Sequence, residues 1–210
     1  MAKYDPNKHH RRSIRLKNYD YASAGAYFVT ICVQHRQPLF GTIVNQTMVL
    51  NDAGIMVQTI WESLPKWFPH IEMDEFVVMP NHFHGILVIH AGHNVGPSDH
   101  NTGTSDHNVG VSLVDTPMDA PDTPDRATTR VAPTLGNMIG AFKSITTHQY
   151  IQGVRQKDWP PFDGRLWQRN YWEHIIRDEQ SLHRIRNYIQ SNPISWEQDS
   201  LHPTANRKKE

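Results

Sequence analysis

Residues 74–90, DEFVVMPNHFHGILVIH, constrain the fold more than any other part of the chain. Two apolar runs of strand length flank Pro80 and Asn81, and a proline cannot donate a hydrogen bond inside a sheet. The segment therefore predicts either two strands joined at this break or one strand that is kinked there. Because side chains alternate along a strand, His82 and His84 share one face and Phe83 points to the other.

Two imidazoles on one face of a sheet can hold two adjacent coordination positions of a metal ion. They make a weak site by themselves, so a metal would need a third ligand from elsewhere in the fold. The spacing also fits a pair of surface histidines on an edge strand. By spacing alone that simpler interpretation is favoured, because His-x-His is short and common.

Hydrophobic periodicity and capping residues predict the remaining elements. Their order implies an α+β domain of the ferredoxin-like type, with a mostly antiparallel sheet and helices packed on one face. The expected elements are a strand at 26–34, a helix after the cap at Asn51 that Pro65 and Pro69 end, a helix from Thr134 to Gly153, a strand with its approach loop at 166–177, and a helix that Asp178 caps and Asn192–Pro193 closes.

Residues 91–133 interrupt this pattern. They begin with a near-perfect seven-residue repeat, AGHNVGP-SDHNTGT-SDHNVGV, and continue as a Pro/Asp/Thr-rich tract. The repeat has no apolar positions at coiled-coil spacing, so we interpret the stretch as a long disordered insertion. Its regularly spaced histidines have no carboxylate or thiolate partner that would favour a metal site.

The charges of the chain are unevenly distributed. The formal net charge is zero, yet outside residues 94–130 the bases exceed the acids by four. The first 18 residues form a basic arm that suits a phosphate backbone, although many solvated termini are also charged. We expect the arm, one folded domain at 19–200 and a basic tail at 201–210. The bases expected to contact a phosphate backbone are Arg11, Arg12, Arg15 and Lys17.

Composition excludes several classes of protein. No stretch approaches the roughly 20 apolar residues of a membrane span, and no apolar core follows the charges at the start of the chain. Neither a membrane segment nor a secretory signal is therefore expected. The single cysteine, Cys32, rules out an internal disulfide and fits a reducing cytoplasm.

The last predicted helix, SLHRIRNYIQSNP, carries a polar column beside its apolar stripe. At about 100° per residue, Arg184, Tyr188 and Asn192 follow one another at intervals of one turn. This places a cation, a phenol and an amide oxygen at the seam between helix and sheet. A tyrosine that only packs at the core edge, with its hydroxyl in water, fits the same pattern.

The string VVMPNHFHGILVI resembles the HUH motif of the single-tyrosine transposases that mobilise bacterial insertion sequences as single strands. The chain resembles the REP-associated tyrosine transposases more closely, over about residues 11–90 and 134–195. The supporting strings are RRSIRLKNYDYASAGAYFVTICV, PNHFH, LGNMIGAFKS, LWQRNYWEHIIRD and RIRNYIQSNP.

The resemblance implies an HUH-type enzyme that cleaves and rejoins single-stranded DNA through a 5′-phosphotyrosine intermediate. By this resemblance, His82 and His84 bind a divalent metal, Mg²⁺ or Mn²⁺, and Tyr188 is the nucleophile. Asn192 occupies the place where many insertion-sequence relatives carry a glutamine ligand. Tyr171 is a rival nucleophile that the resemblance disfavours.

The implied partners are DNA hairpins of repetitive palindromic elements, which Arg184 and the basic arm would contact. The resemblance further implies a cytoplasmic protein, associated with the nucleoid when bound to DNA, that is a monomer or a homodimer and needs no membrane.

Two alternatives remain open at this point. The chain could be a DNA-binding module that has kept its basic arm and sheet but cuts nothing. It could also be a phosphohydrolase such as the histidine-triad nucleotide hydrolases. Those enzymes have a third alternating histidine. Position 86 of this chain is Ile, which counts against this alternative.

Overall fold

The structure, a computed structural model, describes residue 16 and residues 19–91 and 133–205. The predictions for the basic arm and for residues 92–132 of the insertion lie outside these described residues. None of the described helices is long and apolar enough to cross a membrane.

Four antiparallel strands form the central sheet, in the order β4-β5-β1-β6. Of the two alternatives for the Pro80–Asn81 break, two separate strands are observed, because β4 and β5 form a hairpin closed by a bond from the Met79 amide to the His82 carbonyl. The bounds of the strands are β1 Gly25–Cys32, β4 Ile71–Val78, β5 His82–Ile89 and β6 Trp172–Ile176.

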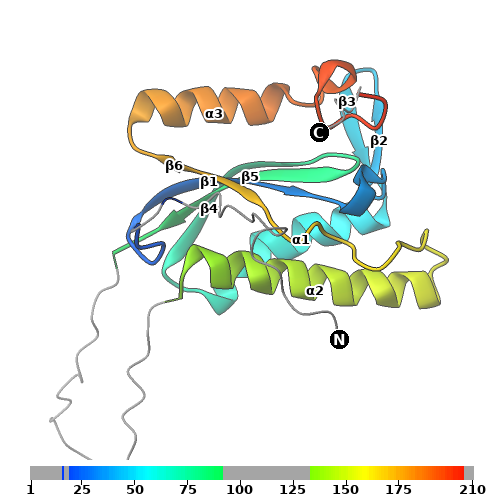
Figure 1. Ribbon diagram of the computed structural model, residues 1–210, viewed down its shortest axis with the longest axis horizontal. Coiled ribbons are helices and arrows are strands. Elements are labelled where there is room, and N and C mark those ends of the chain that lie inside the picture. Colours follow the sequence, from blue (N-terminus) through cyan, green and yellow to red (C-terminus); the bar gives the residue numbers. More distant parts are fainter. Residues whose placement is uncertain (1–15, 17–18, 92–132, 206–210) are drawn as a thin grey trace, which may run out of the picture. The chain divides into compact units, whose positions relative to one another are not determined.

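Helices cover both faces of this sheet (Figure 1). The helices α1 (Asp52–Trp67) and α2 (Leu135–Gln156) pack on one face, and α3 (Glu179–Ser191) lies across the other. The predicted α+β class with an antiparallel sheet is confirmed. The placement of all helices on one face is not, because Phe28, Ile86 and Ile176 give the second face an apolar patch of its own that α3 covers.

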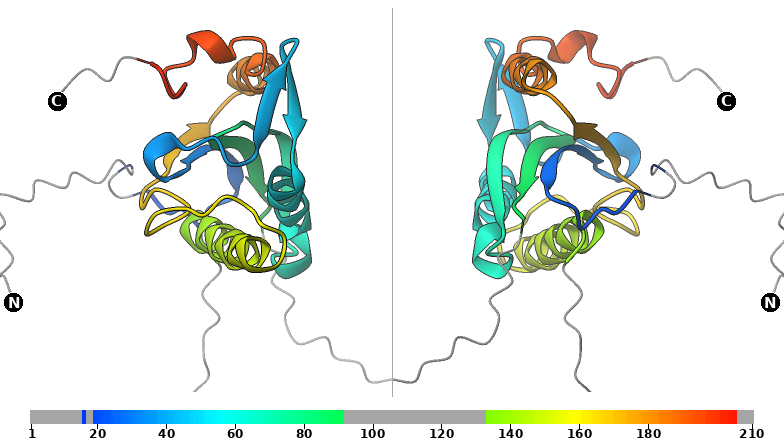
Figure 2. Two further views of the ribbon diagram at one scale, coloured as in Figure 1. Left: turned by 90° about the vertical axis from the view of Figure 1, so that its right-hand side faces the viewer. Right: turned by 90° about the vertical axis from the view of Figure 1, so that its left-hand side faces the viewer.

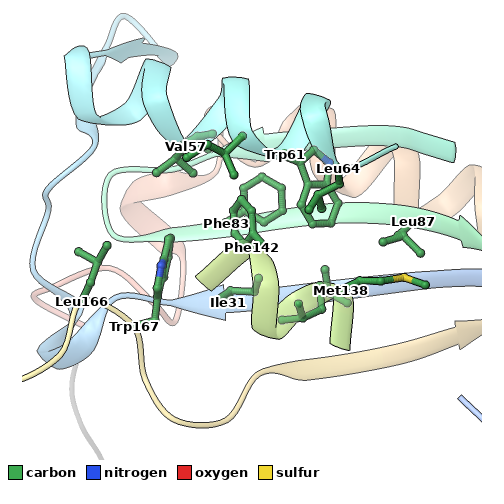
Figure 3. Close-up of a cluster of buried hydrophobic side chains, with 14 of the residues drawn as sticks. Ile31, Val57, Trp61, Leu64, Phe83, Leu87, Met138, Phe142, Leu166 and Trp167 are labelled. Carbon is green, nitrogen blue, oxygen red and sulfur yellow. The ribbon is translucent and has the colours of Figure 1, made fainter. Parts of the chain in front are cut away.

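The larger core lies between the sheet and the pair α1 and α2 (Figure 3). At its centre the rings of Trp61, Phe83 and Phe142 meet, with centroids 4.5–5.3 Å apart. Gly85 lies under them, and a Cβ there would come within 2.7 Å of Trp61, so this position requires glycine. The core fixes β5 in the middle of the sheet, and with it the two histidines on the opposite side of the strand.

The smaller cluster fastens α3 to the second face. Ile189 packs against Phe28 and Ile86. Two hydrogen bonds between Arg186 and Asp74 also hold the helix against β4. Arg186 donates from Nε to Asp74 Oδ1 at 2.9 Å and from Nη2 to Oδ2 at 2.5 Å. A bidentate pair of this kind fixes orientation as well as distance.

Most of the helices and strands begin where the sequence predicts. The predicted caps are confirmed, since Asn51 accepts from the Gly54 amide at 2.9 Å and Asp178 accepts from the Ser181 amide at 2.6 Å. The prediction that Pro65 helps to end its helix is wrong, because α1 continues through Pro65 to Trp67.

A two-stranded hairpin, β2 (Gly41–Val44) with β3 (Thr47–Leu50), was not predicted. It stands beside the chain that follows α3 (Figure 2), and Ile43 and Trp196 line one hollow between the two. That following chain contains the short helix η2 (Trp196–Gln198), and a second short helix, η1 (Gln34–Arg36), follows β1.

Candidate active site

His82 and His84 lie side by side on β5 and are buried, with 0% and 1% of their surfaces exposed. Their ring centroids are 4.6 Å apart, and they face Cys32 and Thr30 of β1 in the strand register. The interpretation as surface histidines on an edge strand is wrong, because β4 and β1 flank β5 on its two sides.

Asn81 fixes the tautomer of His82. Its Nδ2 donates to the carbonyls of Arg36 at 3.1 Å and Leu201 at 2.8 Å, so its Oδ1 is the atom that meets His82 Nδ1 at 2.8 Å. An amide oxygen only accepts, and therefore Nδ1 of His82 carries the proton. The lone pair is left on Nε2, which is the arrangement that a metal-binding histidine needs.

His84 is held between a hydroxyl and a phenol. Its Nδ1 lies 2.8 Å from Thr30 Oγ1, and its Nε2 lies 3.3 Å from Tyr188 Oη. Tyr188 reaches this point from α3 because Ile189, the next residue, is anchored in the smaller cluster. The helix thus brings the phenol oxygen to the histidine pair.

A carboxylate completes the cluster. Asp199 follows η2 and returns toward β5, where its Oδ2 lies 3.8 Å from His82 Nε2. One ligand atom each from His82, His84 and Asp199 lie within 4.8 Å of one another. Asn192 lies at the end of α3 and is 3% exposed, and its amide acts on the pKa values of both His82 and Tyr188.

Three buried polar atoms at this cluster have no hydrogen-bond partner among the described residues. They are His82 Nε2, Asn192 Oδ1 and Asp199 Oδ2. Leaving such atoms unsatisfied is costly, so their convergence fits a metal ion that accepts electron pairs from all of them. Nitrogen and oxygen donors of this kind suit a divalent transition metal or Mg²⁺ with a mixed ligand set.

Burial keeps both imidazoles neutral. It lowers the pKa of His82 to about 3, with a smaller contribution from Arg36, and it lowers the pKa of His84 well below the usual value, with a further contribution from His82. Neutral imidazoles are the form that binds metal. Two neutral imidazoles and one carboxylate carry a single negative charge, so a divalent ion would leave the site with one positive charge.

Arg36 ties the returning chain to the site. Its Nη1 donates to the carbonyl of Ser200 at 2.7 Å, next to Asp199, while its own carbonyl accepts from Asn81. The backbone at His35 and Arg36 has φ values of 59° and 58°, a region that side chains rarely adopt. Backbone in such sparsely populated conformations is frequent at sites where a functional side chain must be held in one position.

The structure brings together four residues singled out in the sequence, His82, His84, Tyr188 and Asn192. Arg184 lies apart from these four residues and lines another hollow beside β6, together with Arg177. The rival Tyr171 lines the same cavity as Tyr188, but its ring also packs against the larger core.

Three further contributors were missed in the sequence: Thr30, Asp199 and, although it belongs to the PNHFH string, Asn81. The amide next to the first histidine was a usable signal for Asn81. Asp199 had no such signal, because it lies seven residues beyond Asn192 in a segment without periodicity.

Comparison with known proteins gives one relative that covers nearly the whole chain. It is an uncharacterized protein of Haemophilus influenzae, 43% identical over 201 residues, which are 96% of this chain and 98% of that protein. The chain belongs to the same family as that protein. No family model matches the chain.

Two solved structures are similar to this chain at lower identity. One is a REP-associated tyrosine transposase bound to a REP hairpin, with a TM-score of 0.48 and 17% identity over 88% of this chain and 74% of that one. The other is a candidate transposase of Deinococcus radiodurans, with a TM-score of 0.40 and 14% identity over 85% of this chain and 96% of that one.

Proposed function

We propose that this protein is a transposase-type enzyme that cleaves and rejoins single-stranded DNA. Tyr188 is the nucleophile, and His82, His84 and Asp199 hold a divalent metal, with Asn192 as a further oxygen donor. The observation that carries the proposal is the 3.3 Å approach of Tyr188 Oη to a buried, neutral histidine pair. The strings shared with the REP-associated tyrosine transposases supply the class of substrate.

The reaction exchanges one phosphoester for another. Tyr188 Oη forms a bond to phosphorus, the bond from phosphorus to the 3′ oxygen breaks, the phenol loses its proton and the 3′ oxygen gains one. Because the phosphotyrosine keeps the bond energy, a second DNA end can reverse the step without ATP. Rejoining then needs no further cofactor.

Tyr188 needs help to ionise. Burial and the charge of Asp199 raise the pKa of its phenol, so the neutral form dominates at neutral pH. The metal, when bound, would supply positive charge that favours the phenolate and offsets charge on the phosphate. Other side chains fix the positions of the ligands and the nucleophile. Thr30 and Asn81 orient the imidazoles, and Arg186 holds α3, which carries Tyr188.

The test is formation of a covalent protein–DNA adduct. Labelled hairpins with single-stranded flanks, taken from the DNA around the gene, are incubated with protein and Mg²⁺ or Mn²⁺ and separated on a denaturing gel. Wild type should form an adduct that a chelator prevents. Tyr188→Phe keeps the ring and its packing, so it should bind the hairpin and form no adduct.

Tyr171→Phe is the matched control, because Tyr171 lines the same cavity, and it should keep the adduct. If Tyr188→Phe forms the adduct and Tyr171→Phe does not, the nucleophile is misassigned. His82→Ala and His84→Ala should lose the adduct through the metal. If wild type binds hairpins but forms no adduct with any of them, the protein is a DNA-binding module.

A further inference from the structure

A cavity of about 560 Å³ opens beside the candidate active site on the α3 face of the sheet. Its lining includes His84 and Tyr188 of the candidate site, Ser200 and Leu201 of the chain that follows η2, and Gln168 and residues 170–172 of the chain that leads into β6. Its size is that of a pocket for a small organic molecule. The group that occupies it would therefore lie next to the phosphate that Tyr188 attacks.

Aromatic rings form part of the lining, from Phe28 beside His84 to Trp172. Phe28 is buried at the base, with its ring centroid 5.4 Å from His84, 6.0 Å from Tyr188 and 5.6 Å from Trp172. The Trp172 ring packs edge to face with Phe28, and 49% of the surface of the residue is exposed. It runs parallel to the His174 ring, at an interplanar angle of 4° and a distance of 6.0 Å.

The sheet register places Trp172 in one row with His84. Thr30 of β1 pairs with His84 on one side and with Trp172 on the other. Residues two strands apart in a row are separated by about 10 Å. The exposed indole thus stands at a defined distance from the site, on the same face, and not on a mobile loop.

The chemistry of the lining selects among the parts of a nucleotide. No Lys or Arg is among the described residues that line this cavity, whereas Arg177 and Arg184 line a separate hollow beside β6. A second phosphate, beside the one that Tyr188 attacks, is therefore poorly matched here. A nucleobase is well matched, because it offers a flat face to an indole and polar edges to the amides of Gln168 and Asn170.

We propose that Trp172, supported by Phe28, is a stacking site for a nucleobase next to the phosphate held at Tyr188. This inference rests on the proposed function, because it assumes that single-stranded DNA runs across the α3 face. Trp172 acts as a binding residue that positions the strand, and the indole selects for the presence of a base.

The test compares two probes of equal length and charge, a short oligothymidylate and a base-free deoxyribose-phosphate chain. Binding is measured by fluorescence anisotropy of labelled DNA, with chelator present and in the Tyr188→Phe background, so that no cleavage contributes. Trp172→Ala should weaken binding of the oligothymidylate by about 5- to 150-fold, the range for one stacked base. It should leave binding of the base-free chain unchanged, and Trp172→Phe should restore much of the loss.

Trp67→Ala is the matched control, because Trp67 is 50% exposed and ends α1, a helix on the other face of the sheet. It should leave both affinities unchanged. The stacking site is refuted if Trp172→Ala binds oligothymidylate as tightly as its parent, or if it loses affinity equally for both probes. If the parent itself binds no single-stranded DNA, the proposed function fails with it.

Discussion

Acidifying the metal-free protein from pH 7 to pH 5 should destabilise it through His82 and His84. Both imidazoles are buried, and burial holds their pKa values below the ordinary value of 6.5, at about 3 for His82. At pH 5 the unfolded chain has protonated both histidines, whereas in the folded protein His82 is still neutral and burial opposes protonation of His84. The unfolded state then binds more protons, so stability falls as pH falls.

The size of the effect follows from linkage. Between an unfolded pKa of 6.5 and pH 5 lie 1.5 units, each worth about 1.36 kcal/mol. His82 therefore removes about 2 kcal/mol at pH 5, and His84 adds a further loss in the same direction. That is a large part of the roughly 5–15 kcal/mol that stabilises a typical domain. The contribution of His82 is fully present above pH 6.5 and is lost as the pH falls toward its folded pKa of about 3.

Urea unfolding at pH 7, 6 and 5 in the presence of chelator measures this loss directly. His84→Gln should lose less stability than wild type between pH 7 and pH 5, because it removes one of the two buried imidazoles. His90→Gln is the control, since the His90 side chain is 55% exposed and pairs with Glu72 at the end of the sheet. Equal losses in wild type and His84→Gln would refute the reasoning.

Two further predictions concern side chains that support the site, and a third concerns the insertion. Asn81→Ala should weaken Mn²⁺ binding by about 10- to 100-fold in a calorimetric titration, because the neighbouring histidine loses the bond that fixes its tautomer; unchanged affinity would contradict this. Arg186→Met should slow adduct formation at saturating DNA without weakening binding, and Asp74→Asn should add no further loss in the double variant, because both changes release the same tie on α3. A chain in which a short Gly/Ser linker joins Ala91 to Val131 should stay folded and active, with circular dichroism and the adduct gel as readouts; insoluble protein would show that the repeat is needed.

Local geometry is what the sequence by itself determined about this protein. The two-residue period of a strand puts His82 and His84 on one face, wherever that strand lies in the fold. The 3.6-residue period of a helix puts Tyr188 and Asn192 on one flank, and the acceptor side chains of Asn51 and Asp178 mark the starts of helices. These features depend on neighbours within a few residues, so they could be predicted without any knowledge of the fold.

Only the tertiary structure decided what surrounds those residues. The burial of the histidines, the return of Asp199 and the alignment of Trp172 with His84 join parts of the chain between 50 and 150 residues apart. Such neighbours are set by the total burial of both faces of the sheet, a sum over the whole domain that no local period contains. Burial of the apolar patch around Phe28 requires α3 on the second face of the sheet. This placement brings the phenol of Tyr188 to the histidine pair.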